Sequence, residues 1–299
     1  MILQSSFYAF SFQFSIPPLF PNFKPSMKRA LATILFFLFG GLLFAQSSGE
    51  PLDWGARSQA MGNAAVMLDG TWSIFQNQAG LASMDRISAG AFYMSRYNLD
   101  ELSTGGLGVA LPAAGGTFGL AYVSYGYTAY REQRVGLSYA RQLGEKLDVG
   151  VQLDYIGVSL GGQYGSTAAF TFEGGAIYRA SEEITLAVHV FNPMRVKLAE
   201  FNDERLPAVL RFGGMYRFSD RVALTGEIRK HIEYDPSVAV GLEYEVVTDL
   251  YVRGGVAGAP SRFSFGAGYR FKAFQIDVSA AVVETIGYTP QVSLTYNGQ

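Results

Sequence analysis

Charged side chains of both signs recur at even spacings within segments of the middle and C-terminal parts of the chain. They are Asp148, Asp154, Arg211, Arg217, Glu227, Arg229, Glu243, Arg253, Arg270 and Asp277. Side chains spaced in this way lie on one face of an extended strand. Opposite charges that share a confined interior can pair with one another and brace it, or they can line a selective polar pore. The interleaving of both signs favours paired charges.

Acid–base or metal chemistry has few candidates. The two histidines are His189, with no acid or serine two residues away, and His231, which precedes Glu233 and Asp235. We therefore expect two surface or girdle histidines and no Ser–His hydrolase. Cysteine is absent, which excludes a thiolate site. The sequence indicates a protein that is not an enzyme and needs no cofactor or metal.

These charges lie in segments of about ten residues in which apolar and polar residues alternate, from about 86 to 296. In 262–272, Phe263, Phe265, Tyr269 and Phe271 fall on one face, and arginine, serine and glycine fall on the other. A period of two residues predicts β-strands. In a transmembrane β-barrel the apolar face meets lipid, whereas in a soluble sandwich it turns inward. Periodicity alone does not choose between them.

An export signal favours the barrel. Met27-Lys28-Arg29 is a basic start, 30–44 is an apolar run, and Ala45 is a plausible cleavage point. The run is shorter than the ~20 residues of a spanning helix. We expect that 1–26 are not translated because of a misassigned start codon, that 27–45 are the signal peptide, and that 46–85 and 86–299 form an N-terminal segment and a barrel.

Composition narrows the class further. Hydrophobic residues make up 49% of the chain, yet no apolar run after the signal is long enough to span a membrane as a helix. A closed β-barrel in the outer membrane is the remaining spanning solution, with outer-membrane lipid as a partner. The formal net charge of −2 predicts no nucleic-acid partner.

We count fourteen strands, with twelve as the alternative. They are predicted near 86–95, 103–111, 116–125, 130–142, 146–159, 167–179, 183–191, 207–218, 221–231, 237–246, 249–257, 261–271, 273–282 and 289–296. Connections after the even strands are short and those after the odd strands are mostly longer, which predicts that both termini are periplasmic and that loop 192–206 faces outward. Rings near strand ends, such as Tyr125, Tyr155 and Tyr269, are expected to form aromatic girdles.

The segment 53–82 has a different character. It contains Gly55-Ala56-Arg57, Met61-Gly62 and Asn77-Gln78-Ala79-Gly80-Leu81. It resembles the N-terminal region of FadL-like outer-membrane barrels, including the PorV/PorQ-type branch of Bacteroidota, in which a G-A-R-x-x-x-M-G-x-A stretch precedes N-P-A-G-L. This chain has glutamine in place of the proline.

The resemblance implies a fourteen-stranded barrel with this segment folded inside as a hatch. The hatch residues would include Arg57, Met61, Gly62, Trp72, Asn77, Gly80 and Leu81. The residues themselves agree, because two tryptophans are an unusual apolar load for a free tail. Small residues expected to face the lumen would leave room for it, namely Gly136, Gly150, Gly213, Gly241 and Gly266. The alternative is a short periplasmic helix packed under the barrel.

The resemblance also implies two functions. The first is a passive conduit for small hydrophobic compounds that leave sideways through a strand kink, for which the candidates are Gly105, Gly106, Pro112, Gly115 and Gly116. The second is an accessory to type IX protein secretion that binds a secreted protein and has no transport activity. The sequence identifies neither a substrate nor a cargo.

Overall fold

The computed structural model describes residues 54–162, 165–198, 203–258, 261–283 and 287–298. All of them belong to one structural unit of the chain, residues 42–299. The expected untranslated segment, the signal peptide and residues 46–53 of the expected hatch lie outside the described residues.

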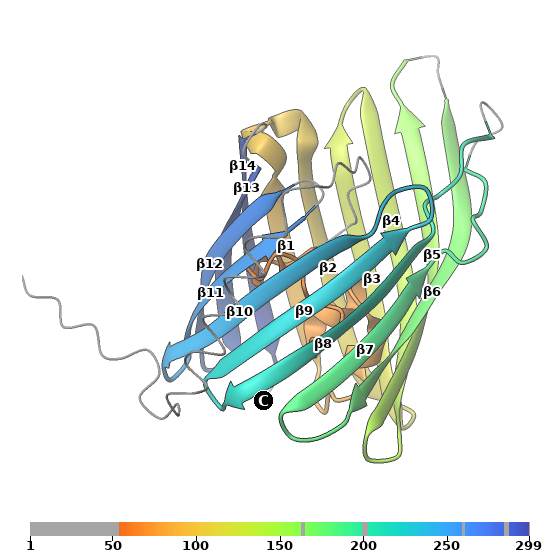
Figure 1. Ribbon diagram of the computed structural model, residues 1–299. Coiled ribbons are helices and arrows are strands. Elements are labelled where there is room, and N and C mark those ends of the chain that lie inside the picture. The colour runs from red at the N-terminus through yellow and green to blue at the C-terminus, as the bar shows by residue number, and fades with distance from the viewer. Residues whose placement is uncertain (1–53, 163–164, 199–202, 259–260, 284–286, 299) are drawn as a thin grey trace, which may run out of the picture. The chain divides into compact units, whose positions relative to one another are not determined.

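Fourteen antiparallel strands close into a barrel in which each strand pairs with its neighbours in the sequence and β1 pairs with β14 (Figure 1). The strands are β1 Ser88–Ser95, β2 Ser103–Ala113, β3 Gly116–Tyr127, β4 Tyr130–Leu143, β5 Leu147–Leu160, β6 Ser166–Arg179, β7 Ile184–Phe191, β8 Val209–Ser219, β9 Val222–His231, β10 Ser237–Val247, β11 Leu250–Ala257, β12 Arg262–Phe271, β13 Phe274–Val283 and β14 Gly287–Asn297. All fourteen predicted strands are confirmed, with ends shifted by at most two residues, and the twelve-strand alternative is wrong.

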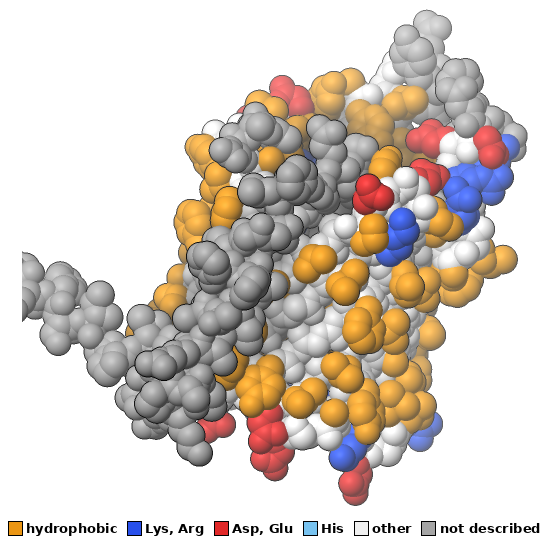
Figure 2. All heavy atoms as spheres, in the orientation of Figure 1, with side chains coloured by type: hydrophobic (Ala, Val, Ile, Leu, Met, Phe, Trp, Pro, Cys, Tyr) orange, Lys and Arg blue, Asp and Glu red, His pale blue; other side chains and the backbone are white. Residues whose placement is uncertain are grey.

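The apolar face of each strand points outward. On β12, Phe263 and Phe265 are 51% and 59% exposed, while Ser264 between them is buried. Figure 2 shows hydrophobic side chains spread over the strands of the face in view, with charged side chains gathered towards its two ends. This is the arrangement of a barrel in lipid, because a soluble sandwich would bury that face. Among the described residues, no helix is long and apolar enough to cross a membrane.

Connections at one end of the barrel are short. Two residues join β2 to β3, β8 to β9, β10 to β11 and β12 to β13. Positive φ at Gly115, Asp249 and Lys272 is what tight hairpins require. At the other end the connections are mostly longer, up to residues 192–208 between β7 and β8, although β3 and β4 are joined by two residues. The predicted difference between short connections after the even strands and mostly longer connections after the odd strands is therefore present.

The segment from Trp54 to Ala82 lies inside the barrel, and we call it the hatch. It contains α2 Ala56–Ala60 and the short 3-10 helices η1 Thr71–Phe75 and η2 Gln78–Leu81. Helix α2 contacts β11–β14, η1 contacts β1–β3, and η2 contacts β3–β6, so the segment touches strands around most of the wall (Figure 1). A helix packed under the barrel is excluded.

Glycines in the wall make room for the hatch. A Cβ atom added to Gly150, Gly213, Gly241 or Gly266 would lie 2.4–2.7 Å from hatch atoms. The expected role of these four residues is therefore confirmed. Gly136 differs, because a Cβ there would first meet the Gln152 side chain of the neighbouring strand.

Candidate functional site

Ion pairs attach the hatch to the wall at several places. Arg57 of α2 donates to Glu243 of β10 through Nε at 2.8 Å and Nη2 at 2.7 Å. Arg253 of β11 donates to the same carboxylate at 2.6 Å and to Asp277 of β13 at 2.7 Å. Two guanidiniums and two carboxylates therefore form one chain from the hatch across three strands.

A second attachment uses the hatch backbone. The Glu227 carboxylate accepts the amide N–H groups of Ala65 and Val66, each at 2.9 Å. Arg211 donates to Glu227 at 2.6 Å and to the Gln76 carbonyl at 3.0 Å. Arg229 donates to Glu227 at 3.1 Å. The Glu227 carboxylate thus supplies these two hatch N–H groups with the hydrogen-bond acceptor that a helix or a sheet would otherwise supply.

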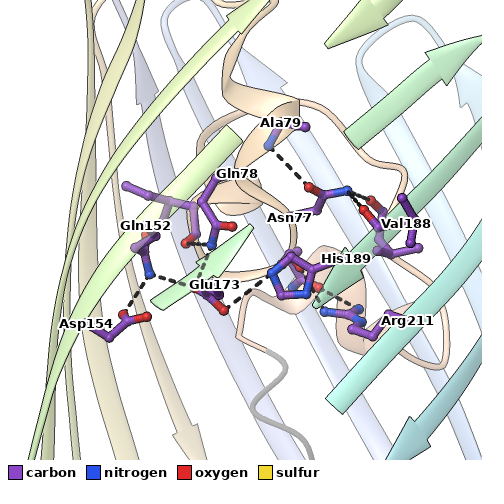
Figure 3. A network of polar contacts seen from close by, with 12 residues as sticks. Asn77, Gln78, Ala79, Gln152, Asp154, Glu173, Val188, His189 and Arg211 are labelled. Atoms are coloured by element: carbon purple, nitrogen blue, oxygen red, sulfur yellow. Dashed lines mark hydrogen bonds and ion pairs between the residues drawn. The ribbon is translucent and has the colours of Figure 1, made fainter. Parts of the chain in front are cut away.

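A third network surrounds η2 and is shown in Figure 3. Arg134 of β4 donates to Asp154 of β5 at 2.8 Å and to Glu173 of β6 at 2.6 Å. Gln78 of the hatch donates to the same Glu173 oxygen at 2.6 Å. His189 is 3% exposed, and its Nε2 lies 3.4 Å from Glu173. The expectation of a surface or girdle histidine is therefore wrong, because His189 falls on the lumenal register of β7.

The hatch asparagine Asn77 fits between two strands of this region (Figure 3). Its Nδ2 donates to Val66 O at 2.9 Å and reaches Val188 O of β7 at 3.3 Å. Its Oδ1 accepts a hydrogen bond from the Ala79 amide N at 3.2 Å, so the Asn77 side chain caps the N-terminus of η2. A Cβ on Gly175 would lie 2.3 Å from Asn77 Oδ1, so glycine is required opposite this side chain.

A fourth attachment shares one arginine between two carboxylates. Arg179 of β6 donates to Asp148 of β5 and, at 2.9 Å, to Asp69 of the hatch. Burial raises the pKa of Asp69 above its ordinary value, and the Arg179 guanidinium opposes this shift. Asp148 is fully buried.

Eight of the ten predicted lumenal charges take part in these pairs, and Arg217 and Arg270 lie exposed near the short-turn end. Arg134, Glu173, Arg179 and Asp69 were missed. Arg134 and Glu173 have the same register as buried neighbours on their strands, so the alternation that identified the others would have identified them. Asp69 has no such signal, since the hatch is not a strand.

The seven predicted hatch residues all lie in the segment inside the barrel. Six of them are buried or nearly so, and the Arg57 side chain is 29% exposed. Gly62 has a φ of 67°, and a Cβ there would lie 2.8 Å from the Val256 carbonyl oxygen. A Cβ on Gly80 would likewise lie only 2.5 Å from the Leu68 carbonyl oxygen.

The candidate kink residues lie in regular structure. Gly105, Gly106 and Pro112 are in β2, whose register with β1 and β3 runs without a shift. Gly115 has a φ of 75° in the hairpin turn, and Gly116 begins β3. The strand pairing is therefore continuous where the kink was expected. Register shifts occur in β8, between Arg217 and Ser219, and in β10, between Glu245 and Val247.

Aromatic rings fill the lumen beside β1–β3. Trp54 lies 5.4 Å from Phe75 and 6.2 Å from Phe92, and Trp72 lies 6.0 Å from Phe92, measured between ring centroids. The facing wall positions are small, including Gly108, beside which a Cβ would lie 3.2 Å from Ile74. On this side of the lumen the hatch and the wall are consequently held together by apolar and aromatic contacts.

Of the cavities bordered by the described residues, two of the larger ones lie on opposite sides of the hatch. The upper cavity, at the end with the longer loops, has a volume of about 380 Å³ and is bordered by Trp54, Val123, Tyr125, Tyr130 and Ile156, together with polar side chains. The lower cavity, of about 340 Å³, is lined largely by charged groups near the short turns. Tyr125 was expected in a girdle, but its register on β3 places it inward.

Among the described residues, no group of three or more His, Asp or Glu side chains could hold a metal ion.

Comparison with known proteins shows the fold. No family model matches the sequence, and no curated protein matches it either. The Ralstonia pickettii toluene transporter TbuX is similar with a TM-score of 0.63 at 14% identity, over 84% of this chain and 99% of that one. The Pseudomonas putida toluene transporter TodX is similar with a TM-score of 0.62 at 13% identity, over 84% of this chain and 99% of that one. A Pseudomonas aeruginosa FadL homologue is similar with a TM-score of 0.57 at 16% identity, over 82% of this chain and 98% of that one.

These proteins share the barrel fold with this chain. Because the sequence identities are only 13–16%, the similarity establishes the fold and nothing more. With fourteen strands, an apolar outer wall and an internal N-terminal segment, the chain has the fold of the FadL-type outer-membrane β-barrels.

Proposed function

We propose that this protein is a passive, non-catalytic conduit in the outer membrane for small hydrophobic compounds. The observation that carries the proposal is the upper cavity, in which Trp54 of the hatch, two aliphatic side chains and two tyrosines meet five polar or charged side chains. Pockets of ~300–1,000 Å³ that combine apolar and aromatic side chains with polar groups are typical ligand sites. The description of TbuX and TodX as toluene transporters supports it.

Size restricts the ligand. A dry cavity of ~150 Å³ is enough for benzene, so about 380 Å³ accommodates a compound of one or two rings. The partners we propose are outer-membrane lipid around the wall and a small hydrophobic ligand within.

Toluene uptake by cells with and without the protein tests the proposal. Val123→Trp should fill the cavity and reduce the uptake rate at least tenfold. Val135→Trp is the matched control, because Val135 lies on the neighbouring strand, faces outward and is 39% exposed. If uptake does not depend on the protein while its loss blocks export of a secreted protein, the secretion-accessory function replaces the conduit.

A further inference from the structure

Two neighbouring rows of the barrel wall border the upper cavity. Thr104 of β2, Tyr125 of β3 and Glu132 of β4 are direct partners in the antiparallel register, and we call these three residues the polar row. Direct partners project from the same face of a sheet, so the three side chains lie next to one another in the lumen. The next lumenal row towards the short turns contains Val123 and Ile156, which also border the cavity. The wall is therefore polar near the longer loops and carries aliphatic side chains below.

The polar row has hydrogen-bonding capacity that the protein does not use. Thr104 is 2% exposed, and among the described residues neither its hydroxyl nor that of Tyr125 forms a hydrogen bond. The Glu132 Oε1 accepts the Tyr130 hydroxyl, while the Oε2 accepts no hydrogen bond within the described part of the chain. A hydroxyl group can both donate and accept, whereas a carboxylate oxygen only accepts. The row thus offers a ligand two hydroxyl groups and one carboxylate oxygen.

The two arginines of the lining already interact within the protein. Arg134 donates to two carboxylates, and its guanidinium lies 5.6 Å from the Trp54 ring centroid and 5.0 Å from that of Phe191. The Arg96 guanidinium lies 5.7 Å from the Tyr125 ring centroid and interacts with a further group. The positive charge of the lining is therefore committed to other groups, and the carboxylate of the polar row disfavours an anionic ligand.

Gln133 borders the cavity as well, but its amide nitrogen is bound on the outer face. The residue alternates with the lumenal Glu132 and Arg134 along β4 and is exposed. Its Nε2 donates to the Tyr122 hydroxyl at 2.8 Å. We therefore do not include Gln133 among the groups that select a ligand.

The polar row discriminates among ring compounds. A hydrocarbon would remove water from the two hydroxyl groups and the carboxylate and replace none of the lost hydrogen bonds, which costs free energy for each buried group. A ketone or an ether accepts from the hydroxyl groups but donates nothing to the carboxylate. A ligand hydroxyl does both, and its hydrogen bond to a carboxylate is of the stronger, charge-assisted type.

We infer that the upper cavity takes a small neutral ring compound that bears a hydroxyl group, with the hydroxyl at the polar row and the ring against Val123 and Ile156. A phenol meets this description, because it is neutral at about pH 7, as the tyrosine side chain is. The inference rests on the proposed function of the cavity as a ligand site and names the class of compound that it selects.

Three compounds test this preference. Toluene, 4-methylanisole and 4-methylphenol share a methyl-substituted ring and carry no oxygen, an acceptor only, or a hydroxyl group. Binding to the purified protein in detergent is measured by isothermal titration calorimetry. Val123→Trp, in which the cavity is filled, supplies the blank for uptake of each compound into detergent. We expect 4-methylphenol to bind at least tenfold more tightly than toluene and at least threefold more tightly than 4-methylanisole.

Variants of the polar row should change the two extremes in opposite directions. Glu132→Gln keeps the size of the side chain and removes its charge. It should weaken 4-methylphenol binding at least threefold and strengthen toluene binding, because an amide costs less to dehydrate than a carboxylate. The double variant Thr104→Val/Tyr125→Phe should have the same opposite effects. Weakened binding of both compounds in both variants would show a structural role and overturn the assignment.

Tyr122→Phe is the matched control. It removes a tyrosine hydroxyl from the outward face of the same strand, where that hydroxyl accepts from Gln133. The affinities of all three compounds should be the same in this variant as in the unmodified protein.

Toluene or 4-methylanisole binding as tight as that of 4-methylphenol would overturn this inference and leave the conduit intact. Absence of cavity binding by all three compounds would also overturn it. In that case toluene uptake that still depends on the protein would leave the conduit standing, and uptake independent of the protein would overturn the proposed function itself.

Discussion

Arg57 and Glu243 form a two-point ion pair between the hatch and the barrel wall, with Nε–Oε2 at 2.8 Å and Nη2–Oε1 at 2.7 Å. Their side chains are 29% and 14% exposed, so the pair is partly removed from water. Removing one partner leaves the other charge uncompensated.

Glu243→Gln should therefore loosen α2 from β10 and β11. We expect a cost of about 2 kcal/mol, below the ~3–5 kcal/mol of a fully buried pair, measured as faster hydrogen exchange in 56–62. Arg270→Gln is the control, because Arg270 is exposed and lies 3.9 Å from Asp249. The exchange rates of 56–62 should not change in that variant, and unchanged exchange in Glu243→Gln would show that the pair does not hold the hatch.

Gly254 and Gly255 are adjacent and face opposite sides of β11. A Cβ on Gly255 would lie 2.2 Å from the backbone of Met61 and Gly62, whereas the nearest atom to a Cβ on Gly254 is 3.9 Å away. Gly255→Ala should displace the hatch and expose it to protease, while Gly254→Ala should not. Equal protease resistance in both variants would contradict the close contact.

Deleting residues 56–82 should leave a folded barrel with an open water path. The reason is that this segment contacts strands around most of the wall and lies directly against the lumenal glycines Gly150, Gly213, Gly241 and Gly266. Single-channel conductance in planar bilayers should be low for the intact protein and rise strongly on deletion. Low conductance after deletion, in a barrel that still folds, would mean that wall side chains close the lumen.

Loop 192–206 is predicted to face the cell exterior and the β8–β9 turn the periplasm. The chain has no cysteine, and Met194 is 72% exposed, so Met194→Cys and Ser219→Cys provide single labelling sites. An impermeant maleimide should label the first on whole cells and the second only after the outer membrane is permeabilised. The reverse result would invert the topology.

N-terminal sequencing of the membrane form tests the processing expected from the sequence. The mature protein should begin near Gln46, because the basic start at Met27 and the apolar run after it form a complete signal. Recovery of residues 1–26 in the mature protein would refute both the start and the signal.

The strands and their inward and outward faces were predictable from the sequence. Alternation with a period of two is a local property, and in a barrel it fixes which side chains meet lipid, so Phe263, Phe265 and Asp277 could be assigned without coordinates. The presence of a hatch was predictable from the apolar load and family-like pattern of 53–82.

The partners of those residues were decided by the tertiary structure. Arg57 and Glu243 are 186 positions apart, and nothing local specifies that pair. His189 and Tyr125 were misplaced because the interpretation followed their residue types, although the alternation along β7 and β3 assigns both side chains to the lumenal face. The upper cavity, by contrast, exists only once Trp54 of the hatch is brought against β3–β5, because a cavity is defined by the surfaces that enclose it.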